Sequence, residues 1–534
     1  MKSRFQLLEA GLFPETLPPC FTSTSVKRSF AGIVRQLDTS SHRERRTEFS
    51  RYNGTKHDGS RRFFATPNII TYFHISTFIW RHWSDFETTY SLSKFSIGAP
   101  NVMAEGSERA VKVPSLSELS KYTSEKIRYA PFILKADIAQ CFPSLYTHSI
   151  AWAAHGIEIS KRDTDRRSTT NYFNALDFFV QSGQRGNTRG VLIGPDGYRL
   201  IAELVLSKID QLLEAEVGNI IVGAVRHVDD YYIGLHSEHD AQAVLSKLRD
   251  VLATYELYLN DAKTRIYSSL EPINDLWAQR LRDHTVYYGS VEKIERAISE
   301  AVATSQAVRS DSPIKILIRS FDEWRLYSSH LWGYAEQNLQ RIVQKHPHAL
   351  DYACLLVSKR HALGLAIDRE GWLSVAKIII KRSLALAHDH EAIWMVWLLL
   401  VCKIELSTEI VDDLSKSRDP HMRALLIEAY IKGYVKSRPK LNLGNSLPTM
   451  DGNWLVNMTA RSRGYSKATF SGDYATEFKH LADRNVRLIN LEAHTKLLKK
   501  VNKRAISRTR YGYDDPEIED QFHDGANDYD PWAD

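Results

Sequence analysis

The chain has 534 residues, of which 43% are hydrophobic and 25% are charged, with 26 Gly and 17 Pro. This balance excludes a wholly disordered or fibrous protein, and at ~150 residues per domain the length predicts three or four units. The four cysteines lie far apart without a CxxC pair, which argues against a disulfide framework and a structural zinc site. The N-terminus has no apolar leader core, and the longest apolar run, residues 392–402, is shorter than the roughly 20 residues of a membrane span. We therefore expect a cytoplasmic protein without a membrane partner.

The formal net charge of +6 is unevenly distributed along the chain. Residues 511–534 hold nine acidic residues and neither Lys nor Arg, which leaves a formal charge of +15 on residues 1–510. A basic body favours a polyanionic partner such as a nucleic acid, although many basic proteins bind none. Residues 506–534 are predicted to form a disordered acidic tail, which either shields the basic surface or only adds solubility.

Residues 1–125 combine helix breakers, a basic stretch and one aromatic helical segment. Prolines among the first 20 residues interrupt any early helix. Residues 43–62 carry seven Lys or Arg against three acids. A helix is expected within the aromatic residues 63–83, beginning after Pro67 and Asn68.

The pattern of residue types changes near residue 130, where short runs of β-branched residues alternate with amphipathic helical patterns. This alternation indicates an α/β or α+β unit, which we place at residues 126–280. The strand patterns are residues 132–134, 220–228 and 231–235, and the helical patterns are residues 200–213 and 241–255.

Strand signals nearly vanish after about residue 280, and helical patterns then follow one another to about residue 503. Successive amphipathic helices with short polar breaks indicate an all-α, helical-repeat-like domain over residues 281–505, although no clean fixed period is visible. The predicted helices include residues 291–307, 314–344, 372–388, 391–402 and 420–432.

The strongest local signal for chemistry is the adjacent pair Asp229 and Asp230. An apolar strand precedes the pair and a second one follows it, so the pair is expected at a hairpin turn, where Asp is common for structural reasons alone. Asp137 ends another strand-like run, FILKAD. If these strands are neighbours, the three carboxylates meet at one end of a sheet.

Three clustered carboxylates repel one another and cannot all stay ionised cheaply unless cations lie between them. Two bridging divalent ions would give the arrangement used for in-line phosphoryl transfer, in which one ion activates the attacking hydroxyl and the other stabilises the leaving pyrophosphate. Hard oxygen ligands favour Mg²⁺ or Mn²⁺. The triplet therefore predicts a magnesium-dependent nucleotidyl-transfer site.

Two further segments fall where a polymerase needs them. Residues 190–195, GVLIGP, open a helix, and Gly at such a place lets the backbone approach a nucleotide closely. Downstream, Lys263 and Thr264 are expected to follow a short strand. Each signal alone is weak, because a Gly-rich loop is usually a turn and a single lysine is usually solvated.

The order and spacing of these segments resemble the fingers and palm of reverse transcriptases. More narrowly, they resemble the bacterial abortive-infection and other antiphage defence-associated reverse transcriptases of the AbiK and AbiA type. The resemblance covers about residues 60–270, and the helical domain after the palm follows the family's habit. The matching pieces are Arg61, Arg62, Pro67, Asn68 and Tyr72; Asp137 with residues 145–150 and Trp152; Gly190, Gly194 and residues 199–203; and Val228, Asp229, Asp230, Lys263 and Thr264.

The resemblance implies roles for the acidic cluster and the lysine. Asp137, Asp229 and Asp230 would hold the metal ions, helped by the backbone carbonyl of Ile138. Lys263 would be the acid that protonates pyrophosphate, with a solvated surface lysine as the plain alternative.

It also implies a nucleotide-binding set. Phe142, five residues after Asp137, would be the bulky gate that blocks a ribose 2′-hydroxyl and selects dNTPs. Arg61 and Arg62 would clamp the triphosphate from the fingers. Gly194 and Arg199, in and after the Gly loop, complete the set. A core Phe and surface arginines are the plain alternatives.

The sequence departs from the family pattern at several points. His227 stands where a Tyr usually precedes the aspartate pair, and residues 190–195 lack the usual Pro and Gln, the Gln being the residue that normally helps to hold primer and template. No primer-grip hairpin, RNase H carboxylate set or HNH-type endonuclease follows residue 270. Residues 511–516, YGYDDP, look superficially like the aspartate-pair signature of reverse transcriptases. They have no apolar strand on either side, so we do not expect them to be catalytic.

The leading hypothesis is a Mg²⁺-dependent DNA polymerase of antiphage defence that makes DNA from dNTPs without a conventional template. The alternatives are an RNA-templated reverse transcriptase that uses a bound non-coding RNA, and a non-catalytic palm that binds nucleic acid. The expected partners are dNTPs, a single-stranded DNA product or RNA, further copies of the chain in a homo-oligomer, and a second defence protein encoded alongside.

The resemblance also raises protein priming, in which DNA grows from a side-chain hydroxyl. A tyrosine is chemically adequate, because a nearby metal ion favours the phenolate. No pattern selects one tyrosine, and the candidates nearest to the expected cleft are Tyr52, Tyr72, Tyr146 and Tyr198.

Overall fold

The computed structural model describes residues 1–38, 45–107, 109–113, 116–271, 277–278, 280–281 and 290–492. The predicted acidic tail, residues 506–534, and the YGYDDP string lie outside these residues. Within them, no helix combines the length and the apolar character that crossing a membrane requires.

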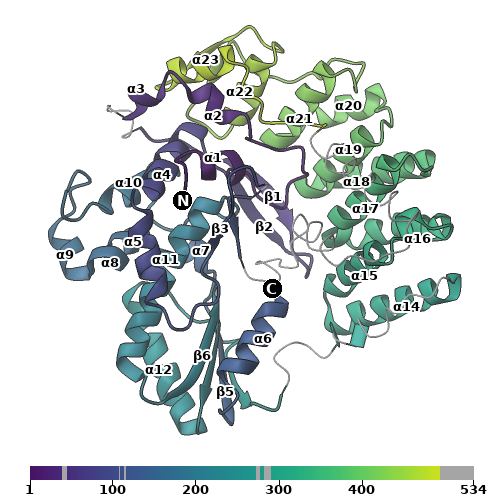
Figure 1. Ribbon diagram of the computed structural model, residues 1–534. Coiled ribbons are helices and arrows are strands. Elements are labelled where there is room, and N and C mark those ends of the chain that lie inside the picture. Colours follow the sequence, from purple (N-terminus) through teal and green to yellow (C-terminus); the bar gives the residue numbers. More distant parts are fainter. Residues whose placement is uncertain are drawn as a thin grey trace, which may run out of the picture.

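A four-stranded antiparallel sheet forms the centre of the predicted palm (Figure 1). Its strand order is β6-β7-β5-β8, so β5 lies between two strands that follow it in sequence. The apolar runs predicted as strands are therefore confirmed. The strands are β5 (Phe132–Asp137), β6 (Ile221–His227), β7 (Asp230–Leu235) and β8 (Arg265–Ser268).

The central strands β5 and β7 are buried on both faces of the sheet because they are apolar at odd and even positions. Leu134 and Ile233 point to the main core, to which helices α11 (Asp196–Val217) and α12 (Glu238–Thr254) contribute. Neighbouring positions such as Ile133 face the opposite way, as the period of two in a strand requires. Helix α6 (Leu116–Lys126) packs against β6 on that side.

The predicted fingers begin with an antiparallel hairpin of β1 (Ser50–Thr55) and β2 (Arg61–Thr66). The helix expected after Pro67 and Asn68 is confirmed as α4 (Ile69–Arg81), whose first turn is capped by the Asn68 side chain, with Oδ1 accepting from Ile70 N at 3.1 Å. The other elements before and within the palm are α1 (Gln6–Ala10), α2 (Val26–Phe30), α3 (Val34–Asp38), α5 (Trp83–Ser91), β3 (Asn101–Val102), β4 (Val111–Lys112), α7 (Cys141–Ser144), α8 (Ser149–His155), α9 (Ile157–Arg162) and α10 (Asn174–Ser182).

Helices dominate the remainder of the described chain and form a curved array beside the hairpin (Figure 1). The single helix expected over residues 314–344 is wrong: a turn with Arg325 at φ 53° and the 3-10 turn η2 (Leu326–Ser328) separate two helices. The repeat character of the array stays a prediction. The helices are α14 (Val291–Val308), α15 (Ser312–Glu323), α16 (Trp332–Lys345), α17 (Leu350–Ala362) preceded by η3 (Pro347–Ala349), α18 (Arg369–Leu386), α19 (Asp389–Val401), α20 (Thr408–Leu414), α21 (Pro420–Ile431), α22 (Trp454–Ser462) and α23 (Ala475–Asp483).

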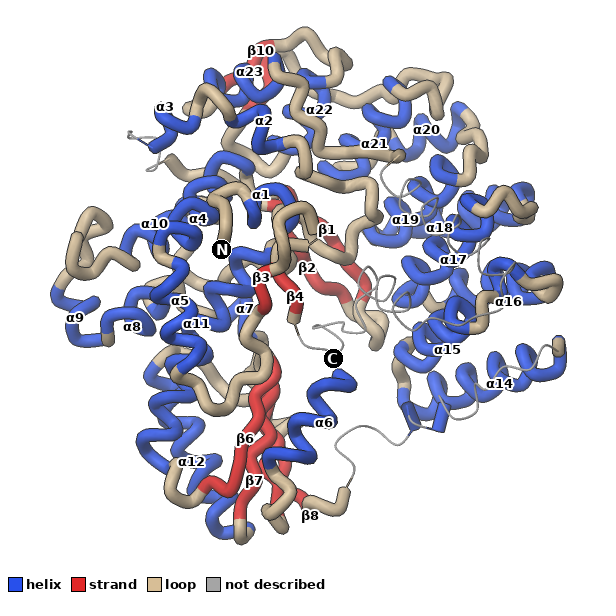
Figure 2. The backbone as a smooth tube through the Cα atoms, viewed as in Figure 1, coloured by secondary structure: helices blue, strands red, loops and turns tan. Residues whose placement is uncertain are grey.

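The all-α expectation for residues 281–505 also fails at one point, where β9 (Ser446–Pro448) and β10 (Thr469–Ser471) form a short parallel pair (Figure 2). These three-residue strands are too short to produce an alternating pattern in the sequence.

The two ends of the described chain lie together. Phe21 and Ile489 form an antiparallel bridge, and Asn490 N donates to Cys20 O at 2.7 Å. The segment that contains α1 to α3 therefore packs with the last described helices, which Figure 1 shows at the top of the molecule.

Candidate active site

The three predicted aspartates meet at one end of the palm sheet. Asp137 is the last residue of β5 and Asp230 the first of β7, and the antiparallel register places them directly opposite each other. Asp229 precedes Asp230 in the turn from β6, and its carbonyl accepts from Ile138 N at 3.1 Å. The neighbouring strands inferred from sequence thus bring the carboxylates together, while their catalytic role stays a prediction.

The turn that carries Asp229 is strained. His227 pairs with Asp230, so Val228 and Asp229 alone connect β6 to β7. Val228 has φ 55°, a left-handed conformation that is unfavourable for a β-branched residue and that hairpin turns usually assign to Gly or Asn. Such strain persists only where surrounding contacts enforce it.

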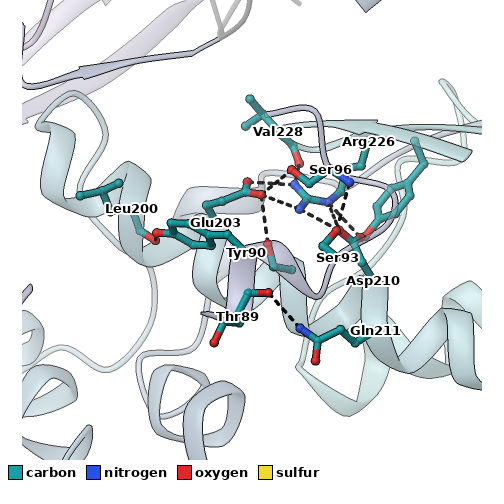
Figure 3. A network of polar contacts seen from close by, with 12 residues as sticks. Thr89, Tyr90, Ser93, Ser96, Leu200, Glu203, Asp210, Gln211, Arg226 and Val228 are labelled. Atoms are coloured by element: carbon teal, nitrogen blue, oxygen red, sulfur yellow. Dashed lines mark hydrogen bonds and ion pairs between the residues drawn. The ribbon is translucent and has the colours of Figure 1, made fainter. Parts of the chain in front are cut away.

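The contact that enforces it comes from Arg226, which is fully buried (Figure 3). Its Nη1 donates to Val228 O at 2.8 Å. The same guanidinium binds two carboxylates of α11: Nη2 lies 2.8 Å from Glu203 Oε1, and Nε lies 2.9 Å from both carboxylate oxygens of Asp210. The turn is therefore tied to the helix behind the sheet.

Hydroxyl groups complete this network. Tyr231 OH donates to Asp210 Oδ1 at 2.8 Å, Ser93 Oγ donates to Asp210 Oδ2 at 2.6 Å, and Ser96 Oγ donates to Glu203 Oε1 at 2.6 Å. Burial alone would lower the pKa of Arg226, but the charges of Asp210 and Glu203 raise it well above its usual value. The guanidinium is thus charged and fully engaged, which buried ion pairs require if they are not to destabilise a fold.

The electrostatics of the aspartate cluster favour a cation. Burial, followed by the charges of Asp230 and Asp137, raises the pKa of Asp229 to about 8. The ammonium of Lys263 opposes this rise and lies 3.6 Å from Asp137 Oδ2. Lys263 is therefore at the site, but in a turn before β8 rather than after a strand as the sequence suggests.

The donor set of the cluster consists of carboxylate oxygens, which suit Mg²⁺ or Mn²⁺ rather than softer metals. Among the described residues, no group of three or more His, Cys, Asp or Glu side chains closes around a single metal position. The three aspartates thus fit such an ion by residue type, by charge and by the backbone register that places Asp137 opposite Asp230.

A small cleft lies beside the strained turn. Phe142, Arg199 and Val228 line it, together with Gly98, whose missing Cβ would stand 3.1 Å from Val228 N. The Phe142 ring is 3% exposed and belongs to α7, the short helix directly after β5. The predicted gate residue therefore lies in a pocket beside Val228, of which none of the three aspartates is a lining residue, and its role as a gate stays a prediction.

Arg199 and Gly194 have local structural partners. Arg199 lines the cleft and its Nη1 lies 2.9 Å from Glu15 Oε1. Gly194 has φ 115°, and a Cβ there would stand 2.7 Å from Pro14 Cγ. Close packing against the N-terminal segment thus accounts for this glycine, and nucleotide contact by either residue stays a prediction.

The two fingers arginines face the helical array. Arg61 Nη1 lies 2.7 Å from Glu391 Oε1 in α19, and Thr55 Oγ1 donates to the same oxygen at 2.8 Å. Arg62 lines a separate cleft against the array. None of the described contacts of Arg61 is with the three aspartates, so the structure does not bring this predicted triphosphate clamp to them.

Three of the four candidate priming tyrosines are inaccessible. Tyr52, Tyr72 and Tyr198 are fully buried, and burial raises the pKa of each phenol. Tyr146 is only partly buried. A priming role for the first three would require a large rearrangement of the core.

Sequence reasoning gave Glu203 and Asp210 no role. A signal was present, because Glu203 and Asp210 are seven residues apart and so lie on one face of α11, among apolar residues such as Leu206. A buried acidic stripe in α11 implies a buried cation, and Arg226 stands directly before the aspartate turn.

No family model and no curated protein matches the chain. Among solved structures, telomerase from Candida albicans in complex with a fragment of telomeric RNA is 12% identical with a TM-score of 0.30, and the match covers 70% of this chain and 68% of that one. Apo telomerase from Candida tropicalis is 11% identical with a TM-score of 0.32, covering 70% and 74%. Likenesses this distant carry no argument about this chain, so the interpretation rests on the site itself.

Replacing Arg226 by Met should lower the free energy of unfolding by about 3–5 kcal/mol, because two buried carboxylates lose their counter-ion. Denaturant unfolding measures the loss. The matched control is Arg249→Met, whose pair with Asp261 has side chains 53% and 80% exposed and should change stability by less than about 1 kcal/mol. Equal effects of the two substitutions would contradict the role given to Arg226.

Proposed function

We propose that the protein is a nucleotidyltransferase of the reverse-transcriptase type that joins dNTPs into DNA with the help of Mg²⁺. The observation that carries this proposal is the placement of Asp137 opposite Asp230, with Asp229 in the adjacent turn, beside a cleft. Three carboxylates at the end of neighbouring strands, of which Asp229 has its pKa raised by burial and by the charges of the other two, are an arrangement suited to binding hard cations.

The residues of the chain divide the work as follows. Asp137, Asp229 and Asp230 would hold the divalent ions, and when bound these would supply activation of the attacking hydroxyl and charge for the leaving pyrophosphate. Lys263, 3.6 Å from Asp137 Oδ2, is placed to give a proton to the leaving group. Arg226 takes no part in the chemistry and holds the turn in its strained form.

Phe142 acts as the sugar gate in this proposal. Its ring lies in the wall of the cleft next to Val228, where it would fill the volume that a ribose 2′-hydroxyl needs. The resulting discrimination is steric and favours dNTPs.

Biological context is supported by the sequence resemblance alone. On that basis the protein acts in antiphage defence in the bacterial cytoplasm, as a homo-oligomer with a companion defence protein, and makes single-stranded DNA without a conventional template from a protein-bound start. Synthesis that is lost after RNase treatment would instead favour the RNA-templated alternative.

The double substitution Asp229→Ala/Asp230→Ala should reduce DNA synthesis by several orders of magnitude, because it removes two of three metal ligands. The assay is incorporation of labelled dNTPs by the purified chain with Mg²⁺. Asp250→Ala, an exposed position on α12, serves as the control and should leave synthesis unchanged. Synthesis by the double variant above one-tenth of the wild-type rate would contradict the assignment and favour the non-catalytic palm.

The substitution Phe142→Ala should admit ribonucleotides, because it empties the space beside the sugar. The measurement is the ratio of incorporation efficiencies for dNTPs and rNTPs, which should fall. Phe478→Ala in α23 also removes a buried ring, but one in the C-terminal part of the chain, and should leave the ratio unchanged. An unaltered ratio in the Phe142 variant would make that residue a packing residue only.

A further inference from the structure

Helices α16 and α18 of the array carry a cluster of exposed basic side chains. The two helices contact each other (Figure 1), and the Arg382 guanidinium of α18 joins them, since its Nη1 donates to Gln344 O at 2.7 Å. Residues 337–350 and 371–388, which hold these positions, contain no Asp or Glu. We call the cluster the α16–α18 face, and its basic members are Arg341, Lys345, Lys377, Lys381 and Arg382, all exposed.

The cations of this face have no acidic partner among the residues that the structure describes. Exposed lysines farther along the array do have one. Lys416 Nζ lies 2.7 Å from Asp413 Oδ1, and Lys436 Nζ lies 2.7 Å from Glu405 Oε1. The positive charge of the α16–α18 face is therefore not balanced by its surroundings.

The spacing of these cations also costs free energy. Arg341 and Lys345 are four residues apart on α16, and Lys377 and Lys381 are four residues apart on α18. Side chains at this spacing are neighbours on a helix surface, and like charges there repel each other. An anionic partner would relieve the repulsion on both helices.

The face also has an apolar component. Ile378 is 53% exposed and Leu386 is 56% exposed, and with Arg382 between them they form a row along α18 at a spacing of four residues. The exposed positions of residues 337–350 and 371–388 include no aromatic side chain on which nucleic-acid bases could stack. The face therefore fits an acidic peptide that carries apolar side chains better than it fits a nucleic-acid strand.

The chain itself contains such a peptide. Residues 511–534 hold nine acidic residues and no Lys or Arg, and they include five aromatic residues. The aromatic residues are Tyr511, Tyr513, Phe522, Tyr529 and Trp532.

The position of the last described residues puts this peptide within reach of the face. Glu492 lies at the array, with its Oε1 3.2 Å from Lys432 Nζ directly after α21. α21 contacts α20, and α20 contacts α18, so neighbouring helices spaced 8–10 Å apart put α18 about 20 Å away. Residues 493–510 can span up to roughly 60 Å when extended. The length of the connection is therefore sufficient.

We propose that the acidic segment 511–534 docks on the α16–α18 face of the same chain. Its carboxylates pair with the cations of α16 and α18, and its aromatic rings cover Ile378 and Leu386. A docked segment keeps other anions, nucleic acid included, away from this face, and salt weakens the contact because the charges are exposed. The proposal does not depend on the aspartate site.

The first test is carbodiimide cross-linking of the full-length chain, which joins carboxylates directly to lysine amines. Because residues 511–534 contain no Lys or Arg, trypsin releases them as one peptide, which mass spectrometry follows. We expect this peptide on Lys345, Lys377 or Lys381, in a product of monomer size, and less of it at high salt. The control is Lys121 on α6, which is also exposed and should not be joined to it.

The second test measures affinity by fluorescence anisotropy. The probe is a labelled peptide with the sequence of residues 511–534, added to the full-length chain in which the nine tail acids are replaced by their amides. Lys377→Gln/Lys381→Gln should weaken binding about fivefold to tenfold. The control Lys416→Gln/Lys436→Gln removes the same charge from the same array and should not weaken it. Ile378→Gln, which changes no charge, should weaken binding about threefold.

Four results would overturn the proposal. Cross-links confined to residues 496–503 would show that the acidic segment pairs with the basic residues before it, and cross-links to Lys121 would place it on the palm. Cross-links found only in a product of dimer size would place it on a second copy. Equal peptide affinity of the Lys377/Lys381 variant, its control and the unsubstituted face would also overturn it, whether or not that face binds a labelled dT20 oligonucleotide.

Discussion

The buried guanidinium of Arg226 is the constraint on which the aspartate site depends. It binds Glu203 and Asp210 on α11 and the carbonyl of Val228 in the turn. A charge inside the core must be matched in full, so the relative positions of helix and turn are fixed to within hydrogen-bond tolerance. The strained Val228 backbone follows, and with it the direction in which Asp229 leaves the sheet.

A second ion pair fixes the hairpin that the sequence assigns to the fingers. Arg61 is held by Glu391 from α19, while the N-terminal segment and the last described helices are joined by the bridge between Phe21 and Ile489. The helical array is thus joined by polar contacts to the elements that precede the palm.

The elements of the fold that could be predicted from the sequence are those that a local pattern of apolar and polar residues determines. Apolar runs marked β5, β6 and β7, and the meeting of Asp137 with Asp230 followed on the condition that their strands are neighbours, which the register of β5 and β7 confirms. It did not predict that Arg61 would pair with a residue 330 positions away, since long-range ion pairs leave no periodic signal. The short pair β9–β10 and the break between α15 and α16 were missed for a related reason, because tertiary packing decides such short elements.

The central claim is that Asp137, Asp229 and Asp230 bind divalent cations for nucleotidyl transfer. Crystals soaked with Mn²⁺ and a non-hydrolysable dNTP analogue, measured at the manganese absorption edge, test it most directly. The account predicts anomalous peaks between Asp137 and Asp230, at the distances from carboxylate oxygens that are usual for Mn²⁺. Manganese found elsewhere, with none at the end of strands β5 and β7, would contradict it.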